Sequence, residues 1–230
     1  PDIEESERDR LIRSVKEADK AQGMDRFKME RLEMDKQTLT VMLQENIDDL
    51  QKKSAAIEAQ NRELEIEKAL EKVRSAALAM KELGDMVDVC HIISDQLGLL
   101  GVKEIRNVQT AIFYVDKGTY FNYEFYRLHN KSLITEVEYR THPVSADFAE
   151  RMLKGSDDYF TRSLVGEELK DWYAFQQTTN QFVDTHLAIA ASLNYYWFSL
   201  GPVALGMSTY APLNEEELKL FKRFRNVFEL

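Results

Sequence analysis

Apolar residues in the first part of the chain recur every seven positions, at Leu43, Leu50, Ile57 and Leu64. The positions three residues after each of them are polar. One apolar column beside a polar one is typical of a weak coiled-coil seam, in which the polar residues lower stability but fix the register. The pattern predicts a long helix that pairs with a second copy of the chain, in either parallel or antiparallel orientation. Residues 24–83 contain neither Gly nor Pro, so that stretch alone would be on the order of 90 Å long.

A break in this pattern follows at Gly84 and Asp85. Gly is favoured just after the end of a helix, and Asp is favoured at the start of the next one. Apolar positions at helical spacing resume at Met86 and run to Leu97. The sequence therefore predicts a joint at Gly84 and Asp85 between the long helix and a second, shorter helix.

The rest of the chain alternates between strand-like and helix-like spacing of apolar residues. Strands are expected at 108–115, 120–126, 134–140, 159–164, 193–200 and 203–210, and helices at 146–154, 167–177 and from Asn214. Ser145 is the expected N-cap of the helix at 146–154, and Asn214 with Glu217 has the spacing of a capping box. Short turns between consecutive strands indicate an α+β fold with a mostly antiparallel central sheet and flanking helices, in which the first and last helices pack on one face.

Composition places the boundary of the compact domain. Of 24 aromatic residues only Phe27 precedes residue 84, and 36 of the first 83 residues are charged. A highly charged segment almost free of aromatic residues is typical of an exposed helix. We therefore expect a helical coiled-coil segment over residues 1–83 and a compact domain over residues 84–230.

Charge and cysteine content narrow the classes of protein. A net charge of −10 disfavours direct binding to nucleic acid, and no apolar run is long enough to span a membrane. A single Cys excludes an intrachain disulfide and a zinc site built from cysteines. We expect a cytoplasmic protein. Because the chain starts without Met and stops inside a helical pattern, we also expect it to be a segment of a longer protein.

Four stretches support a resemblance at the level of a family. They are residues 66–80, 166–169, 196–201 and 220–228, which read IEKALEKVRSAALAM, GEEL, YWFSLG and LFKRFRNVF. In this order they are similar to the GAF-like sensor domains, and the helix before them, of bacterial sensor histidine kinases and related signalling proteins. The resemblance covers about residues 62–230. It implies a GAF-like fold, a parallel dimer, and transmission of a signal along helices to an output domain outside this chain.

No residue is expected to be catalytic or to bind a metal ion. The four His residues lack the acidic neighbour of a phospho-accepting His, no two of them have metal-binding spacing, and no Gly-x-Ser-x-Gly motif is present. Cys90 precedes His91, and GAF domains that attach a bilin often do so through a Cys followed by His deep in the domain. Here the pair lies in the first helix of the domain, so Cys90 is interpreted as a buried apolar residue and His91 as solvated beside Asp95. No cofactor is expected.

Aromatic residues are the one suggestion of a ligand. An apolar pocket with a few polar groups is the usual form of a small-molecule site. The alternative is that these side chains fill an ordinary core. The candidate pocket residues are Tyr123, Phe125, Arg140, His142, Trp172, Phe175, Tyr196 and Phe198.

Two hypotheses about function follow. The first is a non-enzymatic sensory or signal-relay module, dimerised through the coiled coil, in which Phe221, Phe224 and Phe228 begin a helix that leaves the domain. The second is a small-molecule-binding enzyme domain with a helical dimerisation arm.

Overall fold

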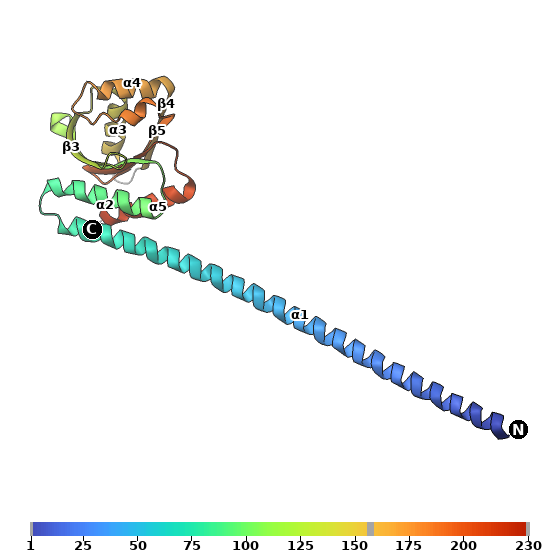
Figure 1. Cartoon of the computed structure of the whole chain (residues 1–230). Coiled ribbons are helices and arrows are strands. Elements are labelled where there is room, and N and C mark those ends of the chain that lie inside the picture. Colours follow the sequence, from blue (N-terminus) through green and yellow to red (C-terminus); the bar gives the residue numbers. More distant parts are fainter. Residues whose placement is uncertain (1, 156–158, 229–230) are drawn as a thin grey trace. The chain divides into compact units, whose positions relative to one another are not determined.

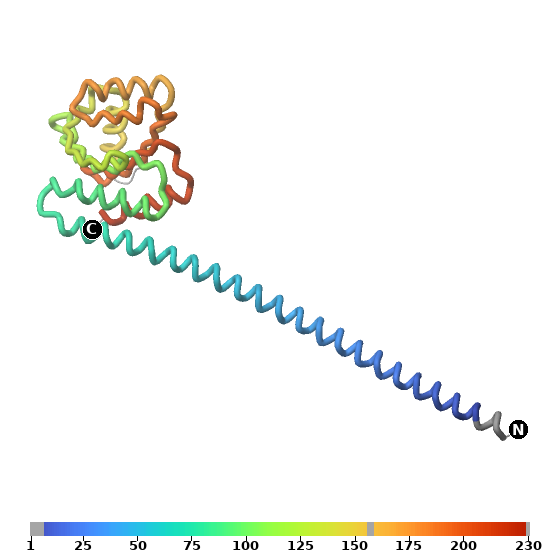
Figure 2. The backbone as a smooth tube through the Cα atoms, viewed as in Figure 1, coloured from blue at the N-terminus to red at the C-terminus, as the bar shows by residue number. Residues whose placement is uncertain are grey.

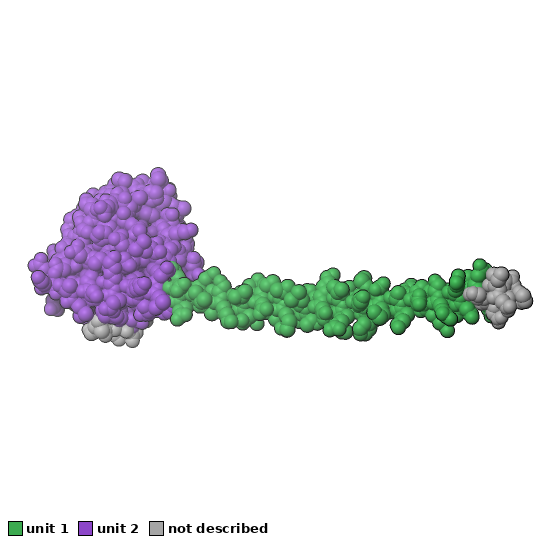
Figure 3. Space-filling model, turned by 60° about the horizontal axis from the view of Figure 1, so that its bottom comes forward, with its two compact units in different colours: residues 1–62 green, residues 63–230 purple. Residues whose placement is uncertain are grey.

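The computed structural model describes residues 2–155 and 159–228. They form two compact units, residues 1–62 and residues 63–230, which are coloured separately in Figure 3. The second unit begins at Glu63, before the boundary at Gly84 that composition suggests. The reason is that Ala69, Leu70 and Val73, which precede Gly84, are buried in its core.

The first unit is helical throughout its described residues. Helix α1 runs from Asp2 to Ala79, as the uninterrupted helical pattern predicts, and its last part belongs to the second unit. The seam residues Leu43, Leu50, Ile57 and Leu64 are each more than half exposed in the single chain. Their pairing with a second copy stays a prediction.

The second unit is built on one six-stranded sheet in the order β3-β2-β1-β6-β5-β4, in which every neighbouring pair is antiparallel (Figure 1). The strands are β1 Ile105–Tyr114, β2 Thr119–Tyr126, β3 Lys131–Glu138, β4 Tyr159–Val165, β5 Ser192–Ser199 and β6 Val203–Thr209. All six expected strands are present, and the antiparallel α+β prediction is confirmed. The structure itself does not establish GAF identity.

Helices cover both faces of this sheet (Figures 1 and 2). Helix α2 (Met86–Leu99), helix α5 (Glu215–Arg225) and the end of α1 share one core with one face, so the first and last helices of the domain lie on the same side as predicted. Helices α3 (Pro143–Lys154) and α4 (Gly166–Gln176) share a second core with the other face. The 3₁₀ turns are η1 Leu83–Asp85, η2 Val115–Lys117, η3 Thr185–Ala188 and η4 Asn226–Phe228.

Local sequence explains the starts of two helices, α5 and α3. Asn214 caps α5 by accepting from the Glu217 amide at 2.9 Å, and the Glu217 carboxylate accepts from the Asn214 amide at 2.9 Å, so the predicted capping box is confirmed. Ser145 is not the N-cap of α3. The helix begins earlier, at Pro143, and the His142 ring accepts from the Val144 amide at 3.2 Å. Pro suits the first helical position because it has no amide hydrogen to satisfy.

The joint differs in detail from the expected pair of caps. Helix α1 ends at Ala79 rather than at Leu83, and Gly84 lies within η1 without a left-handed backbone. The Asp85 carboxylate points back along the chain and accepts from the amides of Lys81 at 2.7 Å and Glu82 at 3.2 Å. Asp85 therefore stabilises the turn before α2 rather than the first amides of α2.

Strand ends also shift by a few residues. Strand β1 begins at Ile105, before the predicted start at 108, because Arg106 and Asn107 are buried strand residues despite their polarity. Strand β3 covers residues 131–138 rather than 134–140, since its pairing extends to Lys131 opposite Tyr126. At the chain's end, Phe221 and Phe224 are buried against the sheet, while Phe228 lies in η4 beyond the end of α5.

Candidate functional site

A cavity lies between the sheet and helices α3 and α4. Together with its opening to solvent it comprises about 450 Å³ of space that no protein atom fills, and the centre of a water molecule can reach about 30 Å³. A cavity that small holds only a few waters as it stands. Aromatic side chains make up much of its wall, namely Tyr120, Tyr126, Phe148, Phe160, Trp172, Tyr195 and Trp197. Polar side chains lie among them, namely Arg106, Gln109, Asn122, Glu124, Ser145, Arg162, Gln176 and Gln181.

Strand β2 supplies one wall through simple alternation. Successive side chains of a strand point to opposite faces. Tyr120, Asn122, Glu124 and Tyr126 line the cavity, whereas the intervening Tyr123 and Phe125 belong to the core on the α2 side. The polar side chains of β2 are therefore buried on the cavity face.

Strand β1 reaches the cavity through an irregularity. Ile105 pairs with Thr209 and Asn107 pairs with Ser208, so Arg106 is an extra residue without an equivalent on β6. This is the geometry of a β-bulge, which redirects a side chain. Ile105 joins the α2 core, while Arg106 lines the cavity and Asn107 bonds with Glu124 and Ser208 on the same face. The bulge places a guanidinium in the cavity wall.

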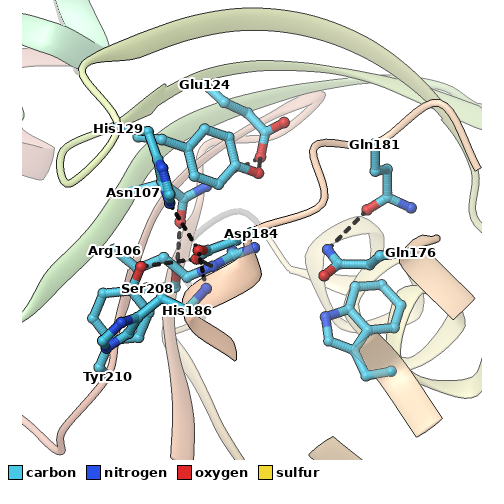
Figure 4. Close-up of polar contacts among 12 residues, drawn as sticks. Arg106, Asn107, Glu124, His129, Gln176, Gln181, Asp184, His186, Ser208 and Tyr210 are labelled. Carbon is cyan, nitrogen blue, oxygen red and sulfur yellow. Dashed lines mark hydrogen bonds and ion pairs between the residues drawn. The ribbon is translucent and has the colours of Figure 1, made fainter. Parts of the chain in front are cut away.

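Arg106 is held there by Asp184, on the segment after α4 (Figure 4). Arg106 Nε donates to Asp184 Oδ2 at 2.8 Å, and the Tyr210 hydroxyl donates to the same oxygen at 2.8 Å. The other oxygen contacts His129 Nε2 at 2.9 Å and accepts from the His186 amide at 3.1 Å. Asp184 is fully buried, and its contacts join four parts of the chain in one polar cluster.

The electrostatics of Asp184 follow from these contacts. Burial alone would raise the pKa of a carboxyl group, because the charged form loses its water. Here the positive charge of Arg106 and the hydrogen bonds from His129, Tyr210 and Arg106 outweigh burial and hold the pKa of Asp184 below its usual value. Asp184 is therefore the ionised partner of Arg106.

Glu124 forms a second buried polar cluster. Its Oε1 accepts from Asn107 Nδ2 at 3.0 Å and from the Tyr126 hydroxyl at 2.9 Å, and its Oε2 accepts from the Thr135 hydroxyl at 3.3 Å. Burial raises the pKa of Glu124, although Arg106 and these hydrogen bonds oppose the rise. All three hydrogen-bond donors are neutral, so no cation is hydrogen-bonded to this carboxyl group within the described residues.

Three polar atoms in the cavity wall have no hydrogen-bond partner among the residues that the structure describes. They are Nη2 of Arg106, Oδ1 of Asn122 and Oε1 of Gln176. Each of these side chains belongs to a residue that is at most 6% exposed. A buried polar group without a partner costs about 1–3 kcal/mol, and native proteins contain few of them. Three such atoms on one cavity make it the candidate functional site.

Helix α4 forms the opposite wall. Trp172 Nε1 donates to the Tyr195 hydroxyl at 2.9 Å, which fixes the indole against β5. Gln176 lies one turn further along α4 and faces Gln181, whose Oε1 is 3.5 Å from Gln176 Nε2 (Figure 4). This weak contact leaves Gln176 as the more adaptable side of the cavity.

The structure divides the eight candidate pocket residues between several places. Tyr123, Phe125, Tyr196 and Phe198 lie in the core on the α2 side of the sheet. Trp172 lines the cavity, and the His142 ring packs on Trp172 and Phe175 at centroid distances of 4.9 and 4.5 Å, with Nε2 3.2 Å from Asp171. Arg140 is exposed beside Tyr139. The eight residues therefore do not form one pocket.

Sequence reasoning missed the polar members of the cavity. Arg106, Asn107 and Gln109 precede or interrupt the apolar pattern from which β1 was predicted, and Asn122 and Glu124 alternate with aromatic residues on β2. Polar residues at every second position of a strand normally indicate the solvent face. Only burial of both faces of the sheet reveals that these residues lie inside.

Cys90 and His91 occupy the expected environments. Cys90 is fully buried beside Ile93 and Leu97 and donates to the Tyr123 carbonyl at 3.3 Å. Burial raises the pKa of the Cys90 thiol to about 12, so the thiol is unreactive at neutral pH. His91 is partly exposed, with Nε2 3.3 Å from Asp95.

Metal-ligand groups and membrane-spanning helices are both absent from the described part of the chain. No three acidic, His or Cys side chains there are grouped to hold a metal ion. No described helix is both long and apolar enough to cross a bilayer.

Comparison with known proteins adds no relative. No protein-family model, curated protein or solved structure matches this chain. The resemblance to GAF-like sensor domains stays a prediction from the four sequence stretches, and the argument for function rests on the cavity and the helices.

Proposed function

We propose that this chain is a non-enzymatic sensory module that binds a small molecule in the cavity and relays the event along helices. The observation that carries the proposal is the set of three buried, unpartnered polar atoms on Arg106, Asn122 and Gln176. A core that only supports the fold gains nothing from them, because each costs stability. A ligand that completes their hydrogen bonds recovers that free energy on binding.

The sheet supplies the route from the cavity to the helices. On β2, Asn122 and Glu124 face the cavity, and the neighbouring Tyr123 and Phe125 pack in the core that contains α2, α5 and the end of α1. A shift of β2 on binding is therefore felt directly in that core. Close-packed interiors transmit such displacements because they contain few voids.

Two of these helices are also tied to each other. The Arg223 guanidinium of α5 donates to both carboxylate oxygens of Glu63, at 2.8 and 2.6 Å, and to Glu67 at 2.6 Å. A planar guanidinium that binds a carboxylate through two hydrogen bonds fixes orientation as well as distance. These contacts link the start and the end of the second unit.

We propose further that a second copy of the chain covers the seam of α1. Leu43, Leu50, Ile57 and Leu64 follow a heptad spacing and are each more than half exposed in the single chain. Burial of one such side chain is worth about 1.5–3 kcal/mol, which is sufficient in sum to hold a dimer. In this proposal the module belongs to a cytoplasmic bacterial signalling protein whose output domain lies outside residues 1–230.

Sedimentation equilibrium of the full chain tests the dimer. The variant Leu50→Asp with Ile57→Asp places two charges in the seam, and we expect it to be a monomer at concentrations where the natural chain is a dimer. The matched control carries Ala55→Asp with Ala59→Asp, two charges at heptad positions outside the seam, and should stay a dimer. A natural chain that is monomeric at tens of micromolar would contradict the proposal.

One observation favours the alternative of a small-molecule-binding enzyme domain. Buried carboxyl groups with a raised pKa are frequent in active sites, and Glu124 is such a group in the cavity wall. An enzyme converts its ligand, whereas a sensor releases it unchanged. Recovery of a bound compound after overnight incubation, followed by NMR, separates the two functions.

A further inference from the structure

The unpartnered atoms of the cavity differ in the partners they accept. Arg106 Nη2 can only donate a hydrogen bond, and a guanidinium pairs best with a carboxylate. Asn122 Oδ1 and Gln176 Oε1 can only accept, so they require a group that donates. A ligand that satisfies all three atoms carries an acceptor, preferably anionic, together with at least one N–H or O–H donor.

The buried charges indicate that the donor is cationic. Arg106 is neutralised by Asp184 through a 2.8 Å ion pair, and Arg162, the other guanidinium of the lining, pairs with Asp147 at 2.8 Å and with Glu168. Glu124 is then a further buried carboxyl group, hydrogen-bonded to neutral groups. A buried carboxylate is stabilised by a nearby positive charge. A protonated amine at this side of the cavity supplies that charge and also donates to the amide oxygens.

The size and walls of the cavity restrict the rest of the ligand. The space open to water is about 30 Å³, so a ligand larger than a few waters enters only if adaptable side chains such as Gln176 change conformation. Phe148, Phe160, Trp172 and Trp197 provide apolar surface beside the polar groups. The ligand therefore combines a compact polar head with an apolar tail.

We propose that the cavity binds an α-amino acid with an apolar or aromatic side chain, its carboxylate on Arg106 Nη2 and its ammonium group on Asn122 Oδ1 and Gln176 Oε1. This inference rests on the proposed function, because it assigns a ligand class to the same cavity. The binding is reversible and non-covalent. Simple anions and simple amines each satisfy only part of the arrangement, and a neutral amide can make the three hydrogen bonds but carries neither charge.

Tryptophan fluorescence of the full chain measures binding directly. The chain has two Trp residues, Trp172 and Trp197, and both line the cavity. We expect at least one of leucine, isoleucine, valine, methionine and phenylalanine to change the emission saturably. The analogues of that compound that lack the amine or the carboxylate should bind at least about tenfold more weakly, because each loses a charge-assisted hydrogen bond. Equal binding of either analogue would overturn the proposal.

Gln176→Leu separates binding from folding. The substitution removes a buried oxygen that has no partner, so the thermal midpoint should stay the same or rise, while affinity for the amino acid falls at least about tenfold. The control Gln177→Leu changes the adjacent, exposed glutamine and should alter neither quantity. If Gln176→Leu does not fold, Gln176→Met serves the same purpose. A folded variant with unchanged affinity would refute the assigned contact.

A second set of compounds distinguishes failure of the amino-acid proposal from failure of the proposed ligand site. The same titration is run with acetamide, imidazole, adenine, acetate and phosphate. If one of these binds and its affinity depends on Gln176 while no amino acid binds, the amino-acid class is wrong but the cavity is still a ligand site. If neither set changes the tryptophan emission at compound concentrations up to about 10 mM, both proposals fail.

Discussion

Replacement of Asp184 by Asn is the sharpest test of how the cavity is held together. The carboxylate is fully buried and contacts Arg106, Tyr210, His129 and the amide of His186 at 2.8 to 3.1 Å. An amide has one acceptor oxygen, and its NH₂ group faces donors that need an acceptor. The substitution also leaves Arg106 as a buried charge whose main partner is gone.

The magnitude follows from these contacts. Removal of one partner from a buried ion pair costs about 3–5 kcal/mol. For a folding unit of this size, each kcal/mol lowers the melting temperature by about 2–4 °C, so Asp184→Asn should lower it by roughly 6–20 °C. The control Asp171→Asn removes a carboxylate that is 77% exposed and pairs with His142, and it should cost less than about 1 kcal/mol.

Acid provides an independent check on the same substitution. Because the folded pKa of Asp184 lies below its unfolded value of about 3.9, its contribution to stability is complete above that value. The contribution is lost as the pH falls through the folded pKa. The difference in the free energy of unfolding between the natural chain and Asp184→Asn should therefore be constant near neutrality and shrink below about pH 4.

Urea denaturation followed by tryptophan emission measures both effects, since Trp172 and Trp197 lie in the second unit and do not report on the rest of α1. If Asp184→Asn and Asp171→Asn lose similar stability, the Asp184 cluster does not hold the cavity together. A difference between the natural chain and Asp184→Asn that persists unchanged to pH 2 would equally refute the charged pairing of Asp184 with Arg106.

Three further substitutions and modifications have defined outcomes. Gly206→Ala should lower stability by about 1–3 kcal/mol in thermal denaturation, because a Cβ there would clash with the Trp197 ring. A change below about 0.5 kcal/mol would show that the indole moves freely. The Cys90 thiol should resist Ellman's reagent at pH 8 until urea unfolds the chain, since burial raises its pKa to about 12. Rapid reaction of the native protein would contradict that burial. Asn214→Ala should cost about 1 kcal/mol through loss of the bond to the Glu217 amide, and Asn214→Asp should restore most of it, as followed by urea denaturation.

The sequence predicts the α+β fold class and the antiparallel sheet because local signals and tertiary structure agree. The capping box at Asn214 and the apolar spacing from Met86 to Leu97 each depend on contacts within a few residues, and both are confirmed. The sequence predicts the position of the joint at Gly84 and Asp85 but not the hydrogen bonds that form there. A carboxylate such as that of Asp85 can accept a hydrogen bond from the amides before it or from those after it in the chain. The conformation of the packed turn determines which amides lie within reach.

The candidate site was much harder to predict, for a physical reason. Tyr123 and Glu124 are neighbours on β2, yet they lie on opposite faces of a sheet that is buried on both sides. Alternation separates the two faces but does not tell which one carries a cavity. Arg106 adds a second difficulty, because a β-bulge depends on pairing with β6, about a hundred residues later in the chain.

Because Arg106 lies in the bulge, the buried guanidinium can be removed without changing the rest of the sheet. Arg106 is one residue more than regular pairing between β1 and β6 requires, so its loss by deletion would bring Ile105 and Asn107 into consecutive pairs with Thr209 and Ser208. A protein lineage can therefore gain or lose the guanidinium by a single codon insertion or deletion, accompanied by a change at Asp184, without altering the order of strands. The polar lining of the cavity can diverge in this way while the scaffold is inherited intact.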